Sequence, residues 1–376
     1  MPGGTRVLIL TAAIGEGHDL PARVLAEGIL EEEPGARVEI VDALAAVGGL
    51  TERVALDGSR FHSGWGNRMF DLEFALVSRF PPTRWLTGAL FVRPASRRMA
   101  AVIDSERPDV VVSTYPGATA GLGRLRAAGR LRVPAVGAIT DLAALRYWAD
   151  PGVDLHLITH PESEAEVRRI APVSAVVCVR GLSSPAFYAA PDPAGWRTEN
   201  GIPAEGSLVA VSGGGWAVGD LEGAAEAALR AGAESVVVLC GRNEAVRSRM
   251  QERFRAERRV IVLGFVGRMS DLLAAAGVLV HSTAGLTVLE AIMRGCRVVS
   301  YGWGRAHIRA NNEAFERYGL AAVARDRGEL EAAIRSALAN PAAPDPSFAA
   351  LPGAAAQVLR LAREAAPSAA PRATRR

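Results

Sequence analysis

The sequence contains no lysine, so all 43 of its basic residues are arginines. They are balanced by 40 acidic residues, and the net charge of +3 is small for a chain of 376 residues. Proteins that bind nucleic acid often carry an array of basic residues interleaved with stacking aromatic residues, and no such array is recognisable here. We therefore do not expect nucleic acid as a partner.

Cysteines and long apolar runs are also scarce. The three cysteines, Cys178, Cys240 and Cys296, lie far apart in apolar runs, and no Cys-x-x-Cys pair occurs. This pattern predicts buried thiols in a reducing compartment. No apolar run reaches the roughly 18 residues that a membrane span needs, and strand-like RVLILT stands where a signal peptide would begin. We expect a cytoplasmic protein, at most peripheral on the inner face of the plasma membrane.

Apolar runs of strand length alternate with amphipathic helical stretches along most of the chain. A first series lies at 6–11, 37–42, 109–113, 133–140, 153–159 and 175–179, and a second at 207–212, 234–240, 259–263, 277–281 and 297–301. Continuous apolar runs that alternate with helices indicate parallel sheets covered on both faces. The sequence therefore predicts an α/β fold with two doubly wound, Rossmann-like domains, as the length also favours.

The series pauses at 181–196, a stretch rich in Pro, Ser and Ala that predicts a linker. We accordingly expect an N-terminal domain over 1–183 and a C-terminal domain over 184–345. A last helix is expected within 346–364, crossing back onto the first domain. The low-complexity end, 365–376, is expected to be a disordered tail.

Two expected strand-to-helix turns are rich in glycine. Gly213, Gly214 and Gly215 follow one apolar run, and Gly17 precedes His18 after another. In open α/β sheets ligands bind at the carboxyl ends of the strands, where glycine lets backbone N–H groups approach a ligand and the helix start adds positive partial charge. We expect the triple glycine to hold a diphosphate. The alternative is a tight turn that needs glycine only for its φ angles.

The first turn nearly matches the dinucleotide-binding pattern G-x-G-x-x-G. Leu20 stands where the third glycine would be, and Asp42 ends the next strand where a ribose-binding acid would lie. A dinucleotide-binding domain is thus one reading of this turn. His18 lies at the start of the helix, where an imidazole can accept a proton near neutral pH. The alternative for His18 is an exposed helix-capping residue.

Six motifs, in order, resemble the family 28 glycosyltransferases, which include the monogalactosyldiacylglycerol synthases, bacterial diacylglycerol glucosyltransferases and the lipid II-forming N-acetylglucosaminyltransferase. The motifs are LTAAIGEGH, ITDLAALRYWADPGVD, VSGGGWAVGD, VLCGRN, GFVGRM and STAGLTVLEA. The resemblance covers most of the chain and implies the GT-B fold, two Rossmann-like domains facing across a cleft. Each glycine turn would then line one side of that cleft.

The resemblance implies a donor site in the C-terminal domain. Gly213, Gly214 and Gly215 would meet the diphosphate of a UDP-sugar or another nucleotide sugar. The backbone of Phe265 and Val266 would read the uracil edge, with Met269 packing nearby. A turn facing the phosphates would comprise Thr283, Ala284, Gly285, Leu286 and Thr287.

The resemblance also implies that Glu290 accepts hydrogen bonds from the ribose; a solvated helix glutamate is the alternative. Arg242 and Asn243 would approach the diphosphate, with a surface role as the alternative. Asn311 matches the family asparagine that follows a pair of sugar-contacting residues, usually two glutamines or Gln-Glu. Here the pair falls on His307 and Ile308, and an isoleucine cannot bond a sugar hydroxyl.

In this interpretation His18 is the general base for the acceptor hydroxyl, and Asp141 is a candidate for the group that aligns it. The segment around Asp141 lacks the family's Cys-His-Pro and has Leu145, Arg146 and Tyr147 near that place. No Asp-x-Asp motif is present, which fits a metal-independent, inverting reaction, and we expect neither a metal nor a cofactor. Gly17 is assigned to the acceptor side of the site.

Residues 60–98 are rich in aromatic residues and arginine, with Trp65, Phe70 and Trp85 among them. One interpretation places these aromatics in a lipid interface, with the arginines on anionic headgroups. The other is an ordinary pair of core helices.

The function expected from these observations is a hexosyltransferase that glycosylates a lipid or other hydrophobic acceptor. Four alternatives remain open: a soluble natural-product acceptor, sugar-nucleotide epimerisation, non-catalytic binding of nucleotide sugars, and a nicotinamide oxidoreductase. A failure to bind UDP would favour the last.

Overall fold

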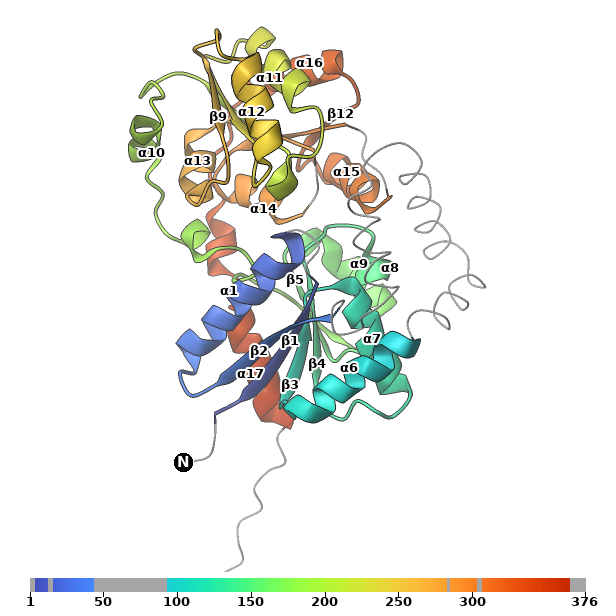
Figure 1. The fold of residues 1–376 in the computed structure, drawn as a ribbon. Coiled ribbons are helices and arrows are strands. Elements are labelled where there is room, and N and C mark those ends of the chain that lie inside the picture. The colour runs from blue at the N-terminus through green and yellow to red at the C-terminus, as the bar shows by residue number, and fades with distance from the viewer. Residues whose placement is uncertain (1–3, 13–15, 44–92, 283–284, 303–305, 366–376) are drawn as a thin grey trace, which may run out of the picture.

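The computed structural model describes residues 4–12, 16–43, 93–282, 285–302 and 306–365. Two parallel six-stranded sheets, each covered by helices, form two domains that lie one above the other in Figure 1. The doubly wound α/β architecture predicted from the alternating runs is therefore confirmed. The exact boundaries drawn between the domains stay a prediction. None of the described helices combines the length and apolar character needed to cross a membrane.

The first sheet has the strand order β2-β1-β3-β4-β5-β6. Its strands are β1 (Arg6–Thr11), β2 (Arg37–Asp42), β3 (Val110–Ser113), β4 (Ala135–Ile139), β5 (Leu155–Ile158) and β6 (Ala175–Cys178). Its helices are α1 (Glu16–Glu32), α6 (Arg93–Glu106), α7 (Pro116–Ala127), α8 (Leu145–Trp148) and α9 (Glu164–Ile170), with a short 3₁₀ helix, η2 (Pro161–Ser163), before α9. Along β1, Val7 and Ile9 face the α1 side while Leu8 and Leu10 face α6 and α7, as the two-residue period of a strand requires.

The second sheet has the order β12-β11-β10-β7-β8-β9. Its strands are β7 (Leu208–Ser212), β8 (Ser235–Leu239), β9 (Val260–Leu263), β10 (Val278–His281), β11 (Arg297–Tyr301) and β12 (Ala322–Ala324). Its helices are α10 (Pro193–Glu199), α11 (Leu221–Arg230), α12 (Glu244–Arg253), α13 (Met269–Ala275), α14 (Leu286–Met293), α15 (Ala306–Tyr318) and α16 (Arg327–Ala339), with the 3₁₀ helix η4 (Gly214–Trp216) after β7. The edge strand β12 was not predicted, because three residues of alanine and valine do not stand out in an alanine-rich sequence.

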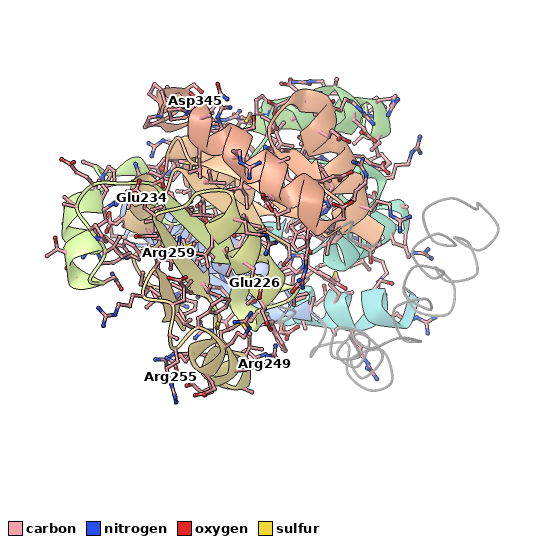
Figure 2. All side chains as sticks on the ribbon, turned by 90° about the horizontal axis from the view of Figure 1, so that it is seen from above. Glu226, Glu234, Arg249, Arg255, Arg259 and Asp345 are labelled. Atoms are coloured by element: carbon pink, nitrogen blue, oxygen red, sulfur yellow. The ribbon has the colours of Figure 1, made fainter. Side chains whose placement is uncertain are left out.

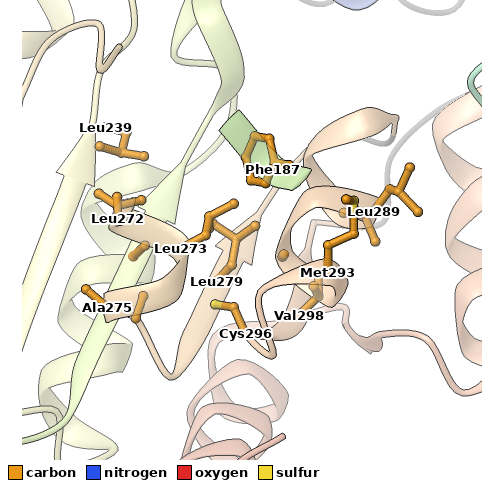
Figure 3. Packing of buried hydrophobic residues seen from close by; sticks show 14 of the residues in the cluster. Phe187, Leu239, Leu272, Leu273, Ala275, Leu279, Leu289, Met293, Cys296 and Val298 are labelled. Atoms are coloured by element: carbon orange, nitrogen blue, oxygen red, sulfur yellow. The ribbon is translucent and has the colours of Figure 1, made fainter. Parts of the chain in front are cut away.

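The core of the second domain reaches into the linker. Phe187, in the 3₁₀ helix η3 (Pro185–Tyr188), packs with Leu273, Leu279 and Leu289 of α13, β10 and α14 (Figure 3). The linker is thus ordered by apolar packing on the second domain.

The outer surface carries charges of both signs, and Glu226 and Arg255 are labelled among them in Figure 2.

The chain crosses between the domains twice, and the two crossings are hydrogen-bonded to each other. Arg180 N–H donates to the Pro352 carbonyl (3.0 Å), and Ala354 N–H donates to the Arg180 carbonyl (2.9 Å). The second crossing contains the 3₁₀ helix η5 (Pro346–Ala350) and leads into α17 (Ala354–Ala365). The regular helix begins later than the expected 346, because Pro352 has no N–H to donate within a helix.

Helix α17 packs on the first domain, beside α1 (Figure 1). Val358 and Leu359 belong to the same buried cluster as Ile9, Leu25 and Ile29. The last described helix of the chain therefore completes the core of the first domain.

We predict that Leu359→Ala lowers the free energy of unfolding by about 2–5 kcal/mol, because it leaves a cavity beneath α17. Leu359 is 1% exposed, whereas its neighbour Arg360 is exposed. Arg360→Ala is the matched control and should change stability by less than about 1 kcal/mol. Denaturant unfolding measures both variants, and equal, small effects would show that α17 does not belong to this core.

Candidate active site

His18 lies in the first turn of α1, at the carboxyl edge of the first sheet. Its Nδ1 is 3.0 Å from the carbonyl oxygen of Thr114, the residue that follows β3. A carbonyl oxygen can only accept, so this hydrogen bond requires the proton on Nδ1 and makes Nε2 the basic nitrogen. The ring also contacts Tyr115 edge-on (5.3 Å between ring centroids) and Trp148 (5.6 Å). His18 therefore has the tautomer and the support that a general base needs.

Asp141 follows β4, and its hydrogen-bond partner is Trp148, whose ring contacts His18. The indole Nε1–H of Trp148 donates to Asp141 Oδ2 at 3.0 Å. The orienting contact to His18 Nδ1 comes from the Thr114 carbonyl instead of the carboxylate that we considered. A backbone carbonyl leaves no signature in a sequence, so this partner could not have been predicted.

Of the histidines whose side chains the structure describes, three others are buried. Burial lowers the pKa of His156, His160 and His281 to about 4 in each case. They stay neutral at physiological pH and are poor acceptors for a catalytic proton. Among the described residues, no three His, Cys, Asp or Glu side chains gather as a metal-binding group. Independence from metal stays a prediction.

The triple-glycine turn follows β7. Its backbone lies close to Val218 and to the loop that contains Gly241. A Cβ on Gly213 would lie 2.5 Å from both the N and the O of Val218, and Gly214 has φ of +69°. Gly241 has φ of +53°, and a Cβ there would lie 2.4 Å from the Gly215 carbonyl oxygen. Gly213, Gly214 and Gly241 are therefore required by backbone conformation or close approach, whether or not a diphosphate binds.

Arg242 and Asn243 come directly after Gly241 and are hydrogen-bonded to the triple-glycine turn. Arg242 N–H donates to the Gly215 carbonyl (2.8 Å), and Asn243 Nδ2 donates to the Trp216 carbonyl (3.3 Å). The Asn243 side chain also caps α12. The Arg242 guanidinium lies 4.1 Å from the ring centroid of Phe265. Phe265 is 56% exposed, and Trp216, at the end of the triple-glycine turn, is 53% exposed. Trp216 was not among the residues predicted for the site.

Val266 and Met269, which were predicted beside Phe265, are both half-buried. Their side chains pack against the core cluster that contains Leu272 and Leu289. The packing role expected for Met269 agrees with this position, while the contact of either residue with a base stays a prediction.

A second turn lies beside the triple glycine, at the start of α14. Thr283 and Ala284 are outside the described residues. Gly285 precedes α14 with φ of +107°, a conformation that is essentially restricted to glycine. Leu286 is buried and Thr287 is half-buried in the first turn of the helix. A hydrogen bond of 2.5 Å from Ser282 Oγ to the Val218 carbonyl joins this turn to the triple-glycine turn.

Glu290 lies in α14 and is only 5% exposed, which excludes the solvated surface glutamate. Ser183 Oγ, from the linker, donates to Glu290 Oε1 at 2.5 Å. Burial raises the pKa of Glu290 to about 7, while this hydrogen bond opposes the shift. The carboxyl group thus lies where the linker meets the second domain, with a pKa close to neutral pH.

Asn311, the residue of α15 that matches the family asparagine, contacts the first domain. Asn311 is fully buried, and its Oδ1 accepts hydrogen bonds from the backbone N–H groups of Leu142 (2.9 Å) and Ala143 (3.1 Å). Ile308 is half-buried, and the side chain of His307 is outside the described residues. A contact between any of these residues and a donor sugar stays a prediction.

The acceptor side is described only in part. Gly17 is exposed beside His18 and has open space where a Cβ would stand. Trp65, Phe70 and Trp85 lie outside the described residues, as does most of the segment 60–98. Membrane contact through that segment therefore stays a prediction.

Two family models match the chain. Residues 26–181 match the model described as monogalactosyldiacylglycerol (MGDG) synthase, and residues 217–340 match glycosyl transferases group 1. The processive diacylglycerol beta-glucosyltransferase of Bacillus subtilis (strain 168) is 23% identical over 342 residues, which cover 89% of this chain and 87% of that protein. The enzyme of the same name from Bacillus cereus (strain ATCC 14579) is 22% identical over 340 residues and covers 89% and 85%.

Solved glycosyltransferases share the fold. Arabidopsis thaliana UGT89C1 superposes with a TM-score of 0.58 at 14% identity, covering 96% of this chain and 99% of that chain. The glycosyltransferase SnogD from Streptomyces nogalater gives a TM-score of 0.51 at 18% identity, covering 96% and 100%. The GT-B fold implied by the motifs is confirmed. The chain is a glycosyltransferase, and its two matched regions and its relatives are similar to the monogalactosyldiacylglycerol synthase-like group of family 28.

Proposed function

We propose that this enzyme transfers a hexose from a UDP-sugar to a hydroxyl group of a membrane lipid, with inversion and without a metal ion, and that His18 is the general base. The observation that carries the proposal is the Nδ1 contact of His18 with the Thr114 carbonyl at 3.0 Å, which makes Nε2 the proton acceptor. A lipid acceptor is supported by relatives named as diacylglycerol glucosyltransferases. A UDP-sugar donor is supported by the UDP-L-rhamnose complex among the fold neighbours.

In the proposed reaction, His18 Nε2 takes the proton of the acceptor hydroxyl as its oxygen attacks the anomeric carbon. The bond between that carbon and the β-phosphate oxygen breaks, and the oxygen leaves with the electron pair as part of UDP. Attack opposite the leaving group inverts the anomeric centre. The imidazolium that forms keeps its Nδ1–H on the Thr114 carbonyl, so the ring need not reorient during proton transfer.

The departing diphosphate would be stabilised by the two turns at the carboxyl edge of the second sheet. Among the described residues, Gly213 and Ser282 are held by hydrogen bonds with Val218. Donors that are held in place before the reaction do not have to reorganise as negative charge develops. In this proposal Glu290 receives the ribose hydroxyls, Phe265 and Val266 receive the base, and Ile308 contributes no hydrogen bond to the sugar.

We predict that His18→Ala lowers kcat by roughly 10²–10⁴-fold, because the acceptor hydroxyl loses its base, while the Kd for UDP changes less than about twofold. Transfer of label from a panel of UDP-sugars to diacylglycerol in mixed micelles measures the first, and calorimetry the second. Glu27→Ala, on an exposed position of the same helix, is the control and should turn over normally.

Turnover of His18→Ala within about tenfold of the parent would remove the histidine from the mechanism. Conversion of the UDP-sugar by the parent enzyme without any acceptor would instead indicate an epimerase. Binding of UDP with no turnover of any acceptor would indicate a nucleotide-sugar-binding protein.

We predict that the affinity for UDP-glucose rises roughly tenfold between about pH 6 and about pH 8, because ribose hydroxyls bind the ionised Glu290 more strongly than the protonated form. The pKa of this carboxyl in the free protein is about 7, so its ionised fraction rises across this range. The phosphates of UDP-glucose do not titrate there. Glu290→Gln should bind more weakly at high pH and lose the pH dependence.

Stability gives an independent check of the same residue. Because burial raises the folded-state pKa above that of the unfolded chain, the folded state retains a proton that the unfolded chain has lost. The free energy of unfolding, relative to Glu290→Gln, should therefore fall as pH rises from about 4.3 through about 7. If the affinity for UDP-glucose does not change with pH while the free energy of unfolding follows this trend, Glu290 is buried but does not belong to the nucleotide site.

A further inference from the structure

The segment 141–148 belongs to the first domain, where Leu145 and Trp148 are buried in a core cluster, but residues 142–143 are seated in the second domain. It leaves β4 at Asp141, and the next side chain, Leu142, is 3% exposed. Leu142 packs in the core cluster of the second domain, with Leu286, Leu289 and Phe315. Residues 142–143 are thus held by the second domain, which carries the proposed donor site.

Asn311 secures the same point by hydrogen bonds. It is 0% exposed, and its single Oδ1 accepts from two backbone N–H groups, the buried one of Leu142 at 2.9 Å and the partly buried one of Ala143 at 3.1 Å. A buried N–H that loses its partner costs about 1–3 kcal/mol. Within the described part of the chain no other group accepts from these two N–H groups, so removing the Asn311 amide would leave both unpaired and weaken the seating of the loop.

The C-terminal end of the segment lies at His18, and its N-terminal end is hydrogen-bonded to that end. Ala144 turns the chain in a left-handed conformation (φ +58°), and the single turn of α8 follows immediately. Trp148, at the end of that turn, donates its indole N–H to Asp141 and places its ring 5.6 Å from the His18 ring. The Asp141–Trp148 bond closes the segment into a loop whose tip is in the second domain and whose base supports the imidazole.

We propose that Asn311 is a positioning residue that couples the donor domain to the general base, by seating residues 142–143 and thereby holding Trp148 against His18. The inference rests on the proposed function, because it assumes that His18 takes the acceptor proton. It assigns Asn311 a different role from the contact with the donor sugar implied by the resemblance. Its Oδ1 is already engaged by two N–H donors, which leaves that oxygen poorly available to a sugar hydroxyl.

The test compares Asn311 with Asn312, the next residue of α15. Asn312 is 1% exposed and equally buried, but its Oδ1 accepts from Ser300 Oγ (2.7 Å) within the second domain. We expect Asn311→Ala to lower kcat about 10- to 100-fold, since misplacement of a catalytic group costs this much, with donor KM and the Kd for UDP within about twofold. Asn312→Ala should lower stability but leave kcat within about threefold.

Asn311→Asp is the conservative variant, because a carboxylate oxygen can accept from the same two N–H groups. It should retain kcat within about threefold. Should Asn311→Ala fail to fold, Asn311→Ser carries the test, since its shorter hydroxyl cannot serve both amides. A loss of kcat in the serine variant alone, with the aspartate variant active, supports the proposal.

A double-mutant cycle with His18→Ala separates positioning from other roles. If Asn311 acts through His18, its substitution should reduce kcat by less than about twofold when the histidine is already alanine. An equal loss in both backgrounds, or a raised donor KM with unchanged kcat, would overturn the inference. Normal turnover of His18→Ala itself would instead refute the proposed function, so the two failures are distinguishable.

Discussion

The burial of Leu142 in the core of the second domain is the contact on which the relation of the two domains depends. A first-domain loop is packed among second-domain side chains and fixed there by Asn311. Two further contacts cross the same boundary, between Ser183 and Glu290 and between the rings of His160 and Phe315. Each involves a buried group, so the interface is held by interior packing and by hydrogen bonds that water cannot easily replace.

These contacts also bear on how the residues of the proposed site, which lie far apart in sequence, would be brought together. His18, Thr114 and Asp141 come from the carboxyl ends of β1, β3 and β4, which a parallel sheet brings to the same edge. The triple glycine and Gly285 occupy the corresponding edge of the second sheet, after β7 and β10. The fold thus sets an imidazole on one domain and two backbone turns on the other, and Leu142 with Asn311 links the edges.

Much of the fold could be predicted because buried parallel strands are continuous apolar runs, and every run from 6–11 to 297–301 contains a strand. β12 was missed because an alanine-rich edge strand of three residues has no distinctive pattern. Candidate site residues could be named from the sequence where chemistry leaves a local mark, as at His18 and Gly213, and their roles stay a prediction. The Thr114 carbonyl, the Trp148 ring and the buried partners of Asn311 depend on tertiary contacts across 96 to 169 positions, or on backbone atoms, and neither is visible in a sequence pattern.

The absence of lysine has a structural counterpart in how the linker and loops are held. Arg294 donates to the carbonyls of Ala186 and Ala189 and to Ser270 Oγ, which fastens the linker to α13 and α14. Arg197 donates to the carbonyls of Pro203, Gly206 and Ala275 in the same manner.

A guanidinium has five donors in a fixed plane, so one side chain can hold several carbonyls at once, which a lysine ammonium does with less geometric control. The linker residue Ser183 is therefore presented to Glu290 by a segment that is anchored within a few residues on its C-terminal side. The hydrogen bond between them consequently reports the position of the linker on the second domain, and the carboxyl that would receive the ribose is the same group that the linker touches.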